Sequence, residues 1–563
     1  MSLYTPLKPW QIRILRLHAG SPGDRLTADL LVADVLDNPG LVLHDAQEAI
    51  EYEAVSYCWG EPVFDPKITV NKCKHAITSN LHQGLQVLRS AHDERYLWID
   101  ALCIDQTDAS DKSAQVQRMF NIFRKARRVV VWLWSIEHMV ESSLAYRQAS
   151  SDFHREAAQS FAVSGTWLQG GRDEGFDEDI LKARLRSRVC HPWVRRAWVQ
   201  QEIFAARQVM VQCGRDTFTF DAFKESATRL SQLISEGGAH APADRADLVY
   251  CNILRSMESS GSVELIAVLE ADRIRKKAGV FCIEPKRYSE GRSGTTSSDE
   301  DETSSLGSFV PPERVTALEC VLAQASNLNA SNHRDRIYAL LSLSTCPTRA
   351  LSMQQLSEAT PRTVDAAIDI DYSRSTSLVF QDVTKYILDR DRSLQILLYH
   401  TGRSHSRQKL GLPSWTPDWR RFERHNHDPR FRQLDRLHKS ELEWSFRSDA
   451  GCLILQGFQV GTIAMSSDDQ PPLIELDDGS KAEPQTEYSV YTTAGDVVIT
   501  CAGSGEWFVM LRPQEKGFLW LGMCVIRMVG SGAEVSVPVQ LSELLPTLKA
   551  RIARREGKDF HVC

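Results

Sequence analysis

The residues with the clearest chemical potential lie between Pro192 and Glu202. Pro192 suits the first turn of a helix. An uninterrupted helix from there puts Arg195, Trp198 and Glu202 at positions i, i+3 and i+7, on one face. A cation, an aromatic plane and a carboxylate together could hold a phosphate, stack a planar base and stabilise an oxocarbenium-like sugar. The alternative is a partly buried Arg–Glu pair beneath a core tryptophan.

A second candidate group belongs to the apolar run Tyr96–Ile104, which predicts a strand. Open α/β sheets bind ligands beyond the carboxyl ends of their strands, where Cys103, Asp105 and Gln106 are expected to emerge. Together with Asp100, such a site could bind ribose hydroxyls. The alternative is that the aspartates hydrogen-bond to local backbone, as Asp often does.

Two further residues near this edge have weaker arguments. Trp59 ends an earlier predicted strand, Tyr52–Tyr57, and either lines the same edge of the sheet or packs in the core. Cys103 is a poor nucleophile because it stands between two apolar residues and no histidine is assigned beside it. We therefore place Trp59, with Asp100, among the candidate binding residues.

The sequence gives no metal site. Asp105, Asp108 and Asp111 lack the spacing and the closing glutamate of a calcium loop, and they suit the start of a helix better. The 13 cysteines contain no Cys-x-x-Cys pair, so we expect free thiols rather than a zinc site. No phosphate-binding Gly-x-x-x-x-Gly-Lys motif occurs, which excludes an NTPase of that type. We expect no bound cofactor.

The elements that must position these residues follow from the hydrophobic pattern. Strands are expected at Ile12–Leu17, Ala28–Leu36, Tyr52–Tyr57, Ile68–Val70 and His75–Thr78, with a turn at Asn-Lys-Cys-Lys between the last two. Ser79 or Asn80 is expected to cap the next helix. Tyr96–Ile104, a helix carrying Val116–Ala126 and the buried strand Arg128–Leu133 then form a strand–helix–strand unit, which predicts a parallel sheet.

The rest of the chain divides by composition into three regions. Residues 217–400 are mainly helical in pattern, with a loop rich in Ser, Gly and acidic residues at 286–309 that we expect to be disordered. Residues 401–440 contain Leu412–Trp419, whose two prolines exclude a regular helix and whose tryptophans are expected to pack against a neighbouring surface. Residues 441–563 predict a small β-rich domain with a closing helix at Leu541–Arg555.

The composition is that of an ordinary globular protein. The chain has 563 residues, of which 42% are hydrophobic and 25% charged, and its net charge is -7. A net negative charge gives no reason to expect a nucleic-acid partner. No apolar run approaches the ~18 residues of a membrane helix. The start lacks the pattern of a secretory signal, so we expect a soluble cytoplasmic protein without a membrane span.

Four phrases of the sequence resemble the hallmark segments of the fungal heterokaryon-incompatibility (HET) domain, in the same order. Their family patterns are YxALSYxWG, LWIDALCINQ, QVxxM and pWxxRxWxxQE. They correspond here to Tyr52–Gly60, Leu97–Gln106, Gln115–Met119 and Pro192–Glu202. Asp105 stands where the family commonly has Asn, and Asp111-Lys112 where it commonly has Glu-Arg.

The resemblance implies a HET domain over residues 1–216, with its hallmark core at 52–214 and an insertion at about 137–180. Looser likenesses continue downstream, at Arg334–Leu340, Asp371–Ser373, Pro413–Trp419 and Gly495–Val498. The implied fold is α/β and TIR-like, meaning a flavodoxin-like, mostly parallel sheet with flanking helices. The mainly helical region and the β-rich C-terminal domain follow it.

The same resemblance implies a role in self/non-self signalling that ends in growth arrest or programmed cell death. In the first hypothesis, the HET domain acts as an interaction module that self-associates or binds protein partners. In the second, it is an enzyme. Some TIR domains cleave NAD with a glutamate, and by order along the chain that analogy points to Glu202 as the catalytic residue. NAD is then a substrate, and death follows its depletion.

Overall fold

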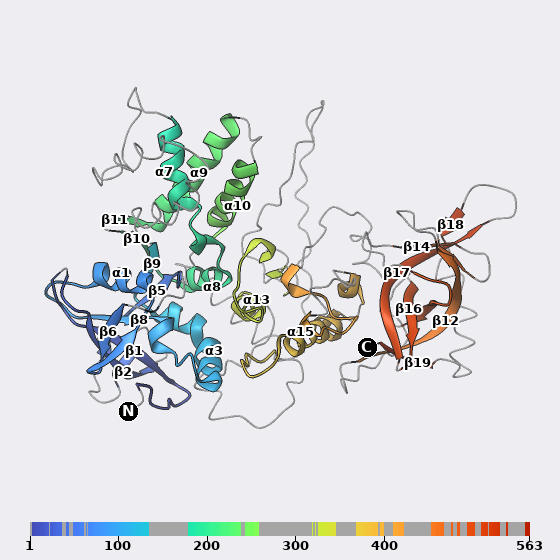
Figure 1. Ribbon diagram of the computed structural model, residues 1–563, viewed down its shortest axis with the longest axis horizontal. Helices are drawn as coiled ribbons and strands as arrows, with labels where there is room; N and C mark the ends of the chain where they lie inside the picture. Colours follow the sequence, from blue (N-terminus) through green and yellow to red (C-terminus); the bar gives the residue numbers. More distant parts are fainter. Residues whose placement is uncertain are drawn as a thin grey trace, which may run out of the picture.

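The computed structural model contains two sheets joined by a helical region (Figure 1). It describes residues 3–133, 178–257, 318–344, 368–398 and 409–421, with gaps of at most five residues. Further on it describes 452–466, 474–476, 481–484, 492–501, 508–529, 536–538 and 558–562. The predicted loop at 286–309, the closing helix at Leu541–Arg555 and nearly all of the predicted insertion lie outside the described residues.

Four parallel strands form the centre of the N-terminal sheet. They are β5 (Glu53–Tyr57), β8 (Arg95–Trp98), β9 (Arg128–Leu133) and β10 (Val209–Cys213). Their order across the sheet is β8-β5-β9-β10, so in chain order the second strand lies beside the first, and the third and fourth follow on the other side. All five residues of β5 are buried, as expected for a central parallel strand.

Helices connect these parallel strands. Helix α1 (Ser79–Leu88) precedes β8, α3 (Ala109–Lys125) joins β8 to β9, and α8 (Ala197–Ala205) leads into β10. Helix α3 packs against α8 through Phe120 and Phe204, whose ring centroids are 6.3 Å apart. The α3–α8 pair therefore forms one helical layer of the domain.

The other half of the sheet is antiparallel, so the expectation of a mostly parallel sheet is only partly correct. Strand β1 (Gln11–Leu17) pairs with both β8 and β2 (Thr27–Val35) in antiparallel fashion. The short strands β3 (Leu41–Leu43) and β4 (Ala49–Ile50) extend that edge, and β11 (Asp216–Thr219) closes the opposite edge. The pattern predicted β1 and β2 but not β3, β4 or β11. It did not predict the pairing, which depends on contacts far apart in the sequence.

The predicted hairpin is present as β6 (Lys67–Val70) and β7 (Cys73–Ala76). Its two-residue turn is Asn71-Lys72, with φ of 47° and 64°. A turn of this kind needs two residues with positive φ, and Asn adopts that conformation more readily than most. The helix after the hairpin is capped by Thr78 rather than by Ser79 or Asn80, because the Thr78 hydroxyl accepts a hydrogen bond from the Leu81 amide at 3.3 Å.

The strand predicted over Tyr96–Ile104 is half as long as expected. Strand β8 ends at Trp98, and residues Asp100–Cys103 form the single helical turn α2. The amide of Cys103 donates to the carbonyl of Ile99 at 2.8 Å, which closes this turn. An apolar run cannot distinguish a strand from a buried helical turn by periodicity alone. Asp100 is consequently the first residue of a turn at the edge of the sheet.

The helical region begins with α7 (Glu178–Val189) and the 3-10 helix η1 (Pro192–Arg195). It continues after β11 with α9 (Phe220–Glu236) and α10 (Pro242–Ser256), then η2 (Ala325–Asn327), α13 (Asp335–Leu341) and α15 (Thr376–Asp391). Trp415 and Trp419 are buried, as predicted, and the indole of Trp419 donates to the carbonyl of Phe380 on α15 at 3.1 Å.

The C-terminal strands form a closed barrel. In the order β12-β13-β14-β17-β16-β15 each strand pairs with the next, and β15 pairs back to β12. Their bounds are Leu453–Ser466, Ile474–Leu476, Lys481–Pro484, Gly517–Val529, Phe508–Gln514 and Val497–Cys501. Strands β18 (Ser536–Pro538) and β19 (Lys558–Val562) pair with β17 and β12. Closure removes the exposed sheet edges.

One cysteine departs from the expectation of free thiols. Cys452, just before β12, is disulfide-bonded. Cys58, Cys103, Cys213 and Cys251 form no disulfide and are buried, where each packs as a small apolar residue.

Candidate functional site

Glu202 lies on α8 and is turned toward the sheet. It is 2% exposed, and its carboxylate accepts a hydrogen bond from the Ser56 hydroxyl. The same Ser56 oxygen accepts a hydrogen bond from the Trp193 indole at 2.8 Å. Strand β5, η1 and α8 thus meet in one buried chain of hydrogen bonds: Trp193, Ser56 and Glu202.

Arg196 supplies the positive charge beside Glu202. Its backbone is extended, with φ −70° and ψ 131°, and it separates η1 from α8 as the residue before the helix. Its guanidinium donates to the carbonyl of Tyr57 at the end of β5. The carboxylates of Glu202 and Asp100 both raise the pKa of Arg196, against the effect of burial, which is the largest and lowers it. Arg196 is therefore the cation that interacts electrostatically with both carboxylates.

Asp100 completes the group from the end of β8. One of its carboxylate oxygens accepts from the Trp59 indole at 3.0 Å, and the other accepts from the Ala101 amide at 2.7 Å. The site consequently gathers at the carboxyl ends of the adjacent strands β5 and β8, where α/β sheets bind ligands. Glu202, Asp100 and Trp59 are thus brought to the same end of the sheet.

Burial sets the protonation of Glu202. It raises the pKa of Glu202 to about 7, and the nearby Asp100 carboxylate adds to that effect. Arg196 and the hydrogen bond from Ser56 oppose it by favouring the charged form. A carboxyl with a pKa near neutrality can donate or accept a proton at physiological pH, which is the property of a general acid or base.

One tyrosine and two thiols near this edge are held in their neutral forms. Burial, and then the Asp100 carboxylate, raise the pKa of Tyr57 well above its usual value. Burial raises the pKa of the Cys58 thiol to about 11 and that of Cys103 to about 12. The thiolate is the nucleophilic form of cysteine. Neither thiol is therefore activated, which agrees with the prediction from the sequence that Cys103 is a poor nucleophile.

Arg195 does not share a face with Glu202, because the predicted uninterrupted helix is broken at Arg196, whereas Trp198 lies one turn before Glu202 on α8. Arg195 donates to the carbonyl of Asn327 at 2.9 Å and lies 5.5 Å from the centroid of the Tyr250 ring. The Trp198 indole donates to the carboxylate of Asp335 on α13. Both side chains are therefore directed toward later parts of the chain.

The acidic residues after β8 form local structure, as the alternative interpretation expected. Asp105 accepts from the amide and the hydroxyl of Thr107 at 3.0 and 2.6 Å. Asp108 caps α3 through the Ser110 amide at 2.8 Å. Gln106 donates to the carbonyl of Asp100 at 2.9 Å. These bonds fix the loop that holds Asp100 in position.

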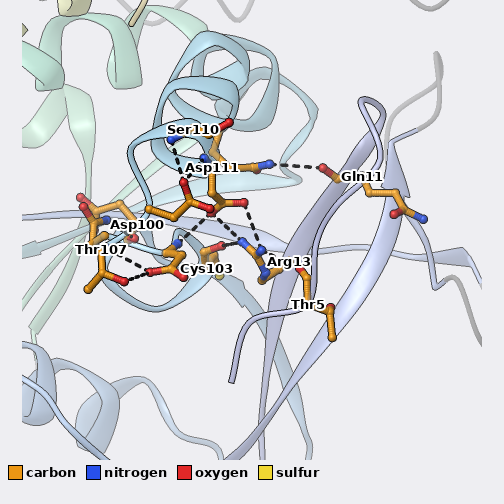
Figure 2. Close-up of polar contacts among 12 residues, drawn as sticks. Thr5, Gln11, Arg13, Asp100, Cys103, Thr107, Ser110 and Asp111 are labelled. Atoms are coloured by element: carbon orange, nitrogen blue, oxygen red, sulfur yellow. Dashed lines mark hydrogen bonds and ion pairs between the residues drawn. The ribbon is translucent and has the colours of Figure 1, made fainter. Parts of the chain in front are cut away.

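A buried ion pair ties that loop to β1 (Figure 2). The Arg13 guanidinium contacts both oxygens of Asp111, at 2.9 and 3.0 Å, and the two side chains are 3% and 10% exposed. Arg13 also donates to the carbonyls of Cys103 at 3.1 Å and Thr5 at 2.8 Å, while Asp111 accepts from the Asp105 amide at 2.9 Å. Two-pronged contacts of this kind fix geometry as well as charge.

Sequence reasoning missed Arg196, Trp193 and Arg13 as parts of this arrangement. The pair Arg195-Arg196 signalled that a cation faces Glu202 but not which one, since the answer depends on where the helix begins. Arg13 alternates with apolar neighbours in a buried strand, and such a charge requires a partner. The sequence contains no local signal that the partner is Asp111.

These features define a class: an α/β domain with a buried acidic and basic cluster at the carboxyl ends of its parallel strands. Residues 52–202 match the family described as heterokaryon incompatibility protein (HET). The chain therefore contains a HET domain of the fungal type, as its hallmark segments predicted. The match runs from the residue before β5 into α8.

The chain is also similar to heterokaryon incompatibility protein 6, OR allele, of Neurospora crassa. The two sequences are 24% identical over 462 residues. That alignment covers 72% of this chain and 57% of the Neurospora protein, so it extends well beyond the HET domain. No solved structure matches the chain.

Two structural features are absent from the described residues. Within those residues, no helix is long and apolar enough to cross a membrane. The same part of the chain contains no group of three or more His, Cys, Asp or Glu side chains placed to hold a metal ion.

Proposed function

We propose that this chain is a heterokaryon-incompatibility type signalling protein, which responds to a self/non-self cue by triggering growth arrest or programmed cell death. Its HET domain acts in this proposal as an interaction and assembly module, through self-association or protein partners. The observation that carries the proposal is the burial of Glu202: it is 2% exposed and bonded to Ser56 within the domain. A carboxylate so enclosed supports a role in holding the domain's shape.

The name of the Neurospora relative supports the proposed role in heterokaryon incompatibility. The Neurospora protein is named for heterokaryon incompatibility, and its similarity to this chain extends past the HET domain. Because the alignment covers only 57% of that protein, its role comes to this chain as part of the proposal.

The strand order supports the proposed TIR-like fold. Flavodoxin-like sheets place the second strand beside the first and continue with the third and fourth on the other side. The four parallel strands here follow that order, β8-β5-β9-β10. The crossover helices α3 and α8 also pack on each other, as consecutive helices on one side of such a sheet do.

A second candidate function is cleavage of NAD at the nicotinamide–ribose bond. The observation that favours it is the pKa of Glu202, raised by burial to about 7, at the end of the sheet where Asp100 and Trp59 also lie. In this alternative the carboxylate stabilises positive charge on the ribose, and the indole of Trp59 stacks on a planar ring. The enclosure of Glu202 requires α8 to move before substrate could approach.

The proposed function is tested by expressing the full chain from a titratable promoter in a filamentous fungus that lacks it. We expect hyphal growth to stop and a membrane-impermeant dye to enter the cells as expression rises. Ser56→Ala is expected to weaken this response, because it leaves Glu202 and the Trp193 indole without a shared partner. Ser235→Ala, which removes a hydroxyl from the exposed side of α9, is the matched control.

The same strains and purified protein separate the two candidate functions. Glu202→Gln keeps the shape of the side chain but removes its charge. Nicotinamide release from NAD by the wild type, lost together with growth arrest in Glu202→Gln, would establish the enzyme. Growth arrest without nicotinamide release supports the interaction module. The absence of any arrest at the highest expression would refute the proposed function.

A further inference from the structure

Helix α8 is covered on both sides. One side faces the sheet through Glu202, and the other faces a region that we call the cover, residues 325–344 and 368–374. Figure 1 shows α13, the helix of the cover, beside α8. Seven of the nine residues of α8 are buried. A helix this short has little stability of its own, so its position depends on what packs against it.

The first contact of the cover is a set of backbone hydrogen bonds to the point where η1 meets α8. Asn329 forms an isolated parallel β-bridge with Arg196. The Ala197 amide donates to the Asn329 carbonyl at 2.9 Å, and the Asn329 amide donates to the Arg195 carbonyl at 2.5 Å. These bonds flank Arg196 in its extended conformation, from which its guanidinium donates to the Tyr57 carbonyl and interacts electrostatically with Glu202. The cover therefore contacts the backbone on both sides of Arg196, the cation beside Glu202.

A second contact is polar and centred on Asp335. The Tyr372 hydroxyl donates to its carboxylate at 2.5 Å, and the Trp198 indole of α8 is its other side-chain donor. The Lys112 ammonium of α3 lies 4.6 Å from the centroid of the Tyr372 ring. The Tyr372 amide also donates to the Ser113 hydroxyl at 2.9 Å. The cover is thus attached to both helices of the α3–α8 layer.

A third contact joins Ser342, just after α13, to the side chain of Gln201 on α8. The cover itself is held together by arginines: Arg334 donates to the carbonyls of Tyr372 and Arg374, each at 2.6 Å, and Arg336 to those of Leu328 and Ser326 at 2.6 Å. Polar contacts of this kind between parts of one chain resemble those of transient protein interfaces. The arginine bonds therefore join the two segments of the cover into one unit.

We propose that the cover is an autoinhibitory element that masks the α3–α8 face of the HET domain and fixes Arg196 in its resting conformation. This inference rests on the proposed function, because the activity being restrained is the growth-arrest signal. Release of the cover exposes the Trp198 and Gln201 side of α8 and frees Arg196. The HET domain signals through the face so uncovered.

The proposal is tested in the full chain with two variants that weaken different contacts. Tyr372→Phe removes the hydroxyl that donates to Asp335 and keeps the ring under Lys112. Asn329→Pro removes the amide that donates to Arg195. Losing one hydrogen bond, to the Asp335 carboxylate or to the Arg195 carbonyl, shifts such an equilibrium by roughly tenfold. We therefore expect growth arrest at about tenfold lower expression than in the wild type.

Tyr52→Phe is the matched control. Tyr52 is 1% exposed, against 8% for Tyr372, and its hydroxyl donates to the Ile122 carbonyl at 2.6 Å, entirely within the HET domain. It weakens the domain to a similar extent without touching the cover, so we expect its arrest threshold not to fall. A lowered threshold in Tyr52→Phe would show that general destabilisation, rather than release of the cover, triggers the signal.

Hydrogen exchange of the purified proteins supplies the structural readout. Amides of α13 are expected to exchange faster in Tyr372→Phe and Asn329→Pro, whereas those of β5 and β9 stay protected. Faster exchange with an unchanged arrest threshold would overturn the autoinhibition while leaving the proposed function intact. Unchanged exchange in both variants would also overturn it, since these contacts would not hold the cover. Failure of every protein, wild type included, to arrest growth would instead refute the proposed function and this inference with it.

Discussion

Glu202 couples the folding of the HET domain to pH. Its pKa in the folded protein is about 7, against an ordinary value of 4.5, so the folded state holds this proton more tightly than the unfolded chain. Its contribution to the free energy of unfolding is complete below pH 4.5 and is lost as the pH rises through 7. The full loss is about 3 kcal/mol. Glu202→Gln, which does not titrate, is expected to abolish this loss.

His191 also makes the stability of the protein depend on pH, so the effect of Glu202 has to be measured by comparing the wild type with Glu202→Gln. It is 1% exposed, and burial lowers its pKa to about 3. Because its folded pKa is depressed, its contribution is present above its ordinary value of 6.5 and is lost as the pH falls. The measurement is therefore the wild-type free energy of unfolding minus that of Glu202→Gln, by urea denaturation from pH 4.5 to 8. A difference that does not change with pH would show that folding leaves the pKa of Glu202 unchanged.

For single residues, the sequence predicted which types of side chain lie together in the site, but not in every case which residue supplies them. An arginine does accompany Glu202, and the Trp-x-x-x-Glu pattern did indicate the helix that carries it. The wrong arginine was chosen because the helix starts at Ala197 instead of Pro192. That start is set by the bridge between Arg196 and Asn329, a contact across more than a hundred residues that no local pattern contains.

Among the elements, the loop between β8 and α3 depends most on a single pair, Arg13 and Asp111. Asp111→Asn leaves the Arg13 charge buried without its counter-ion, and we expect it to lower the free energy of unfolding by about 3 kcal/mol. Chemical denaturation at neutral pH measures the loss. Asp221→Asn is the control: Asp221 pairs with Lys224 on α9 but its side chain is 91% exposed, so no measurable change is expected. Equal stability of the two variants would contradict a stabilising role for the pair.

The same loop shows why one element was mispredicted. The run through Ile104 is uniformly apolar, which suits a buried strand and a buried helical turn equally. The structure forms a turn because Asp100 bonds to the backbone that follows it and Arg13 draws the Cys103 carbonyl toward β1. By contrast, β9 was predicted to the residue. The helical spacing from Val116 to Ala126 correctly indicated the buried face of α3, but not its start at Ala109.

For the whole molecule, the boundaries of the family match differ from those of the folded unit. Residues 52–202 contain β5, β8 and β9 but neither β1, which pairs with β8, nor β10, which pairs with β9. They also lack Arg13 and the cover. The sequence predicted β1 as a strand, yet its place beside β8 follows from the assembled sheet and not from the pattern of either strand.

The last prediction concerns a fragment cut at those boundaries. Removing β1 alone takes away Ile12, Ile14, Leu15 and Leu17, each at most 1% exposed. At about 2 kcal/mol for each side chain, their loss approaches the net stability of a whole domain, about 5–15 kcal/mol. Residues 52–202 alone are therefore expected to show no cooperative thermal transition by circular dichroism, whereas residues 1–257, which restore β1 and β10, are expected to melt cooperatively. A sigmoidal melt of the shorter fragment would mean that β1 and Arg13 are additions to a domain complete without them.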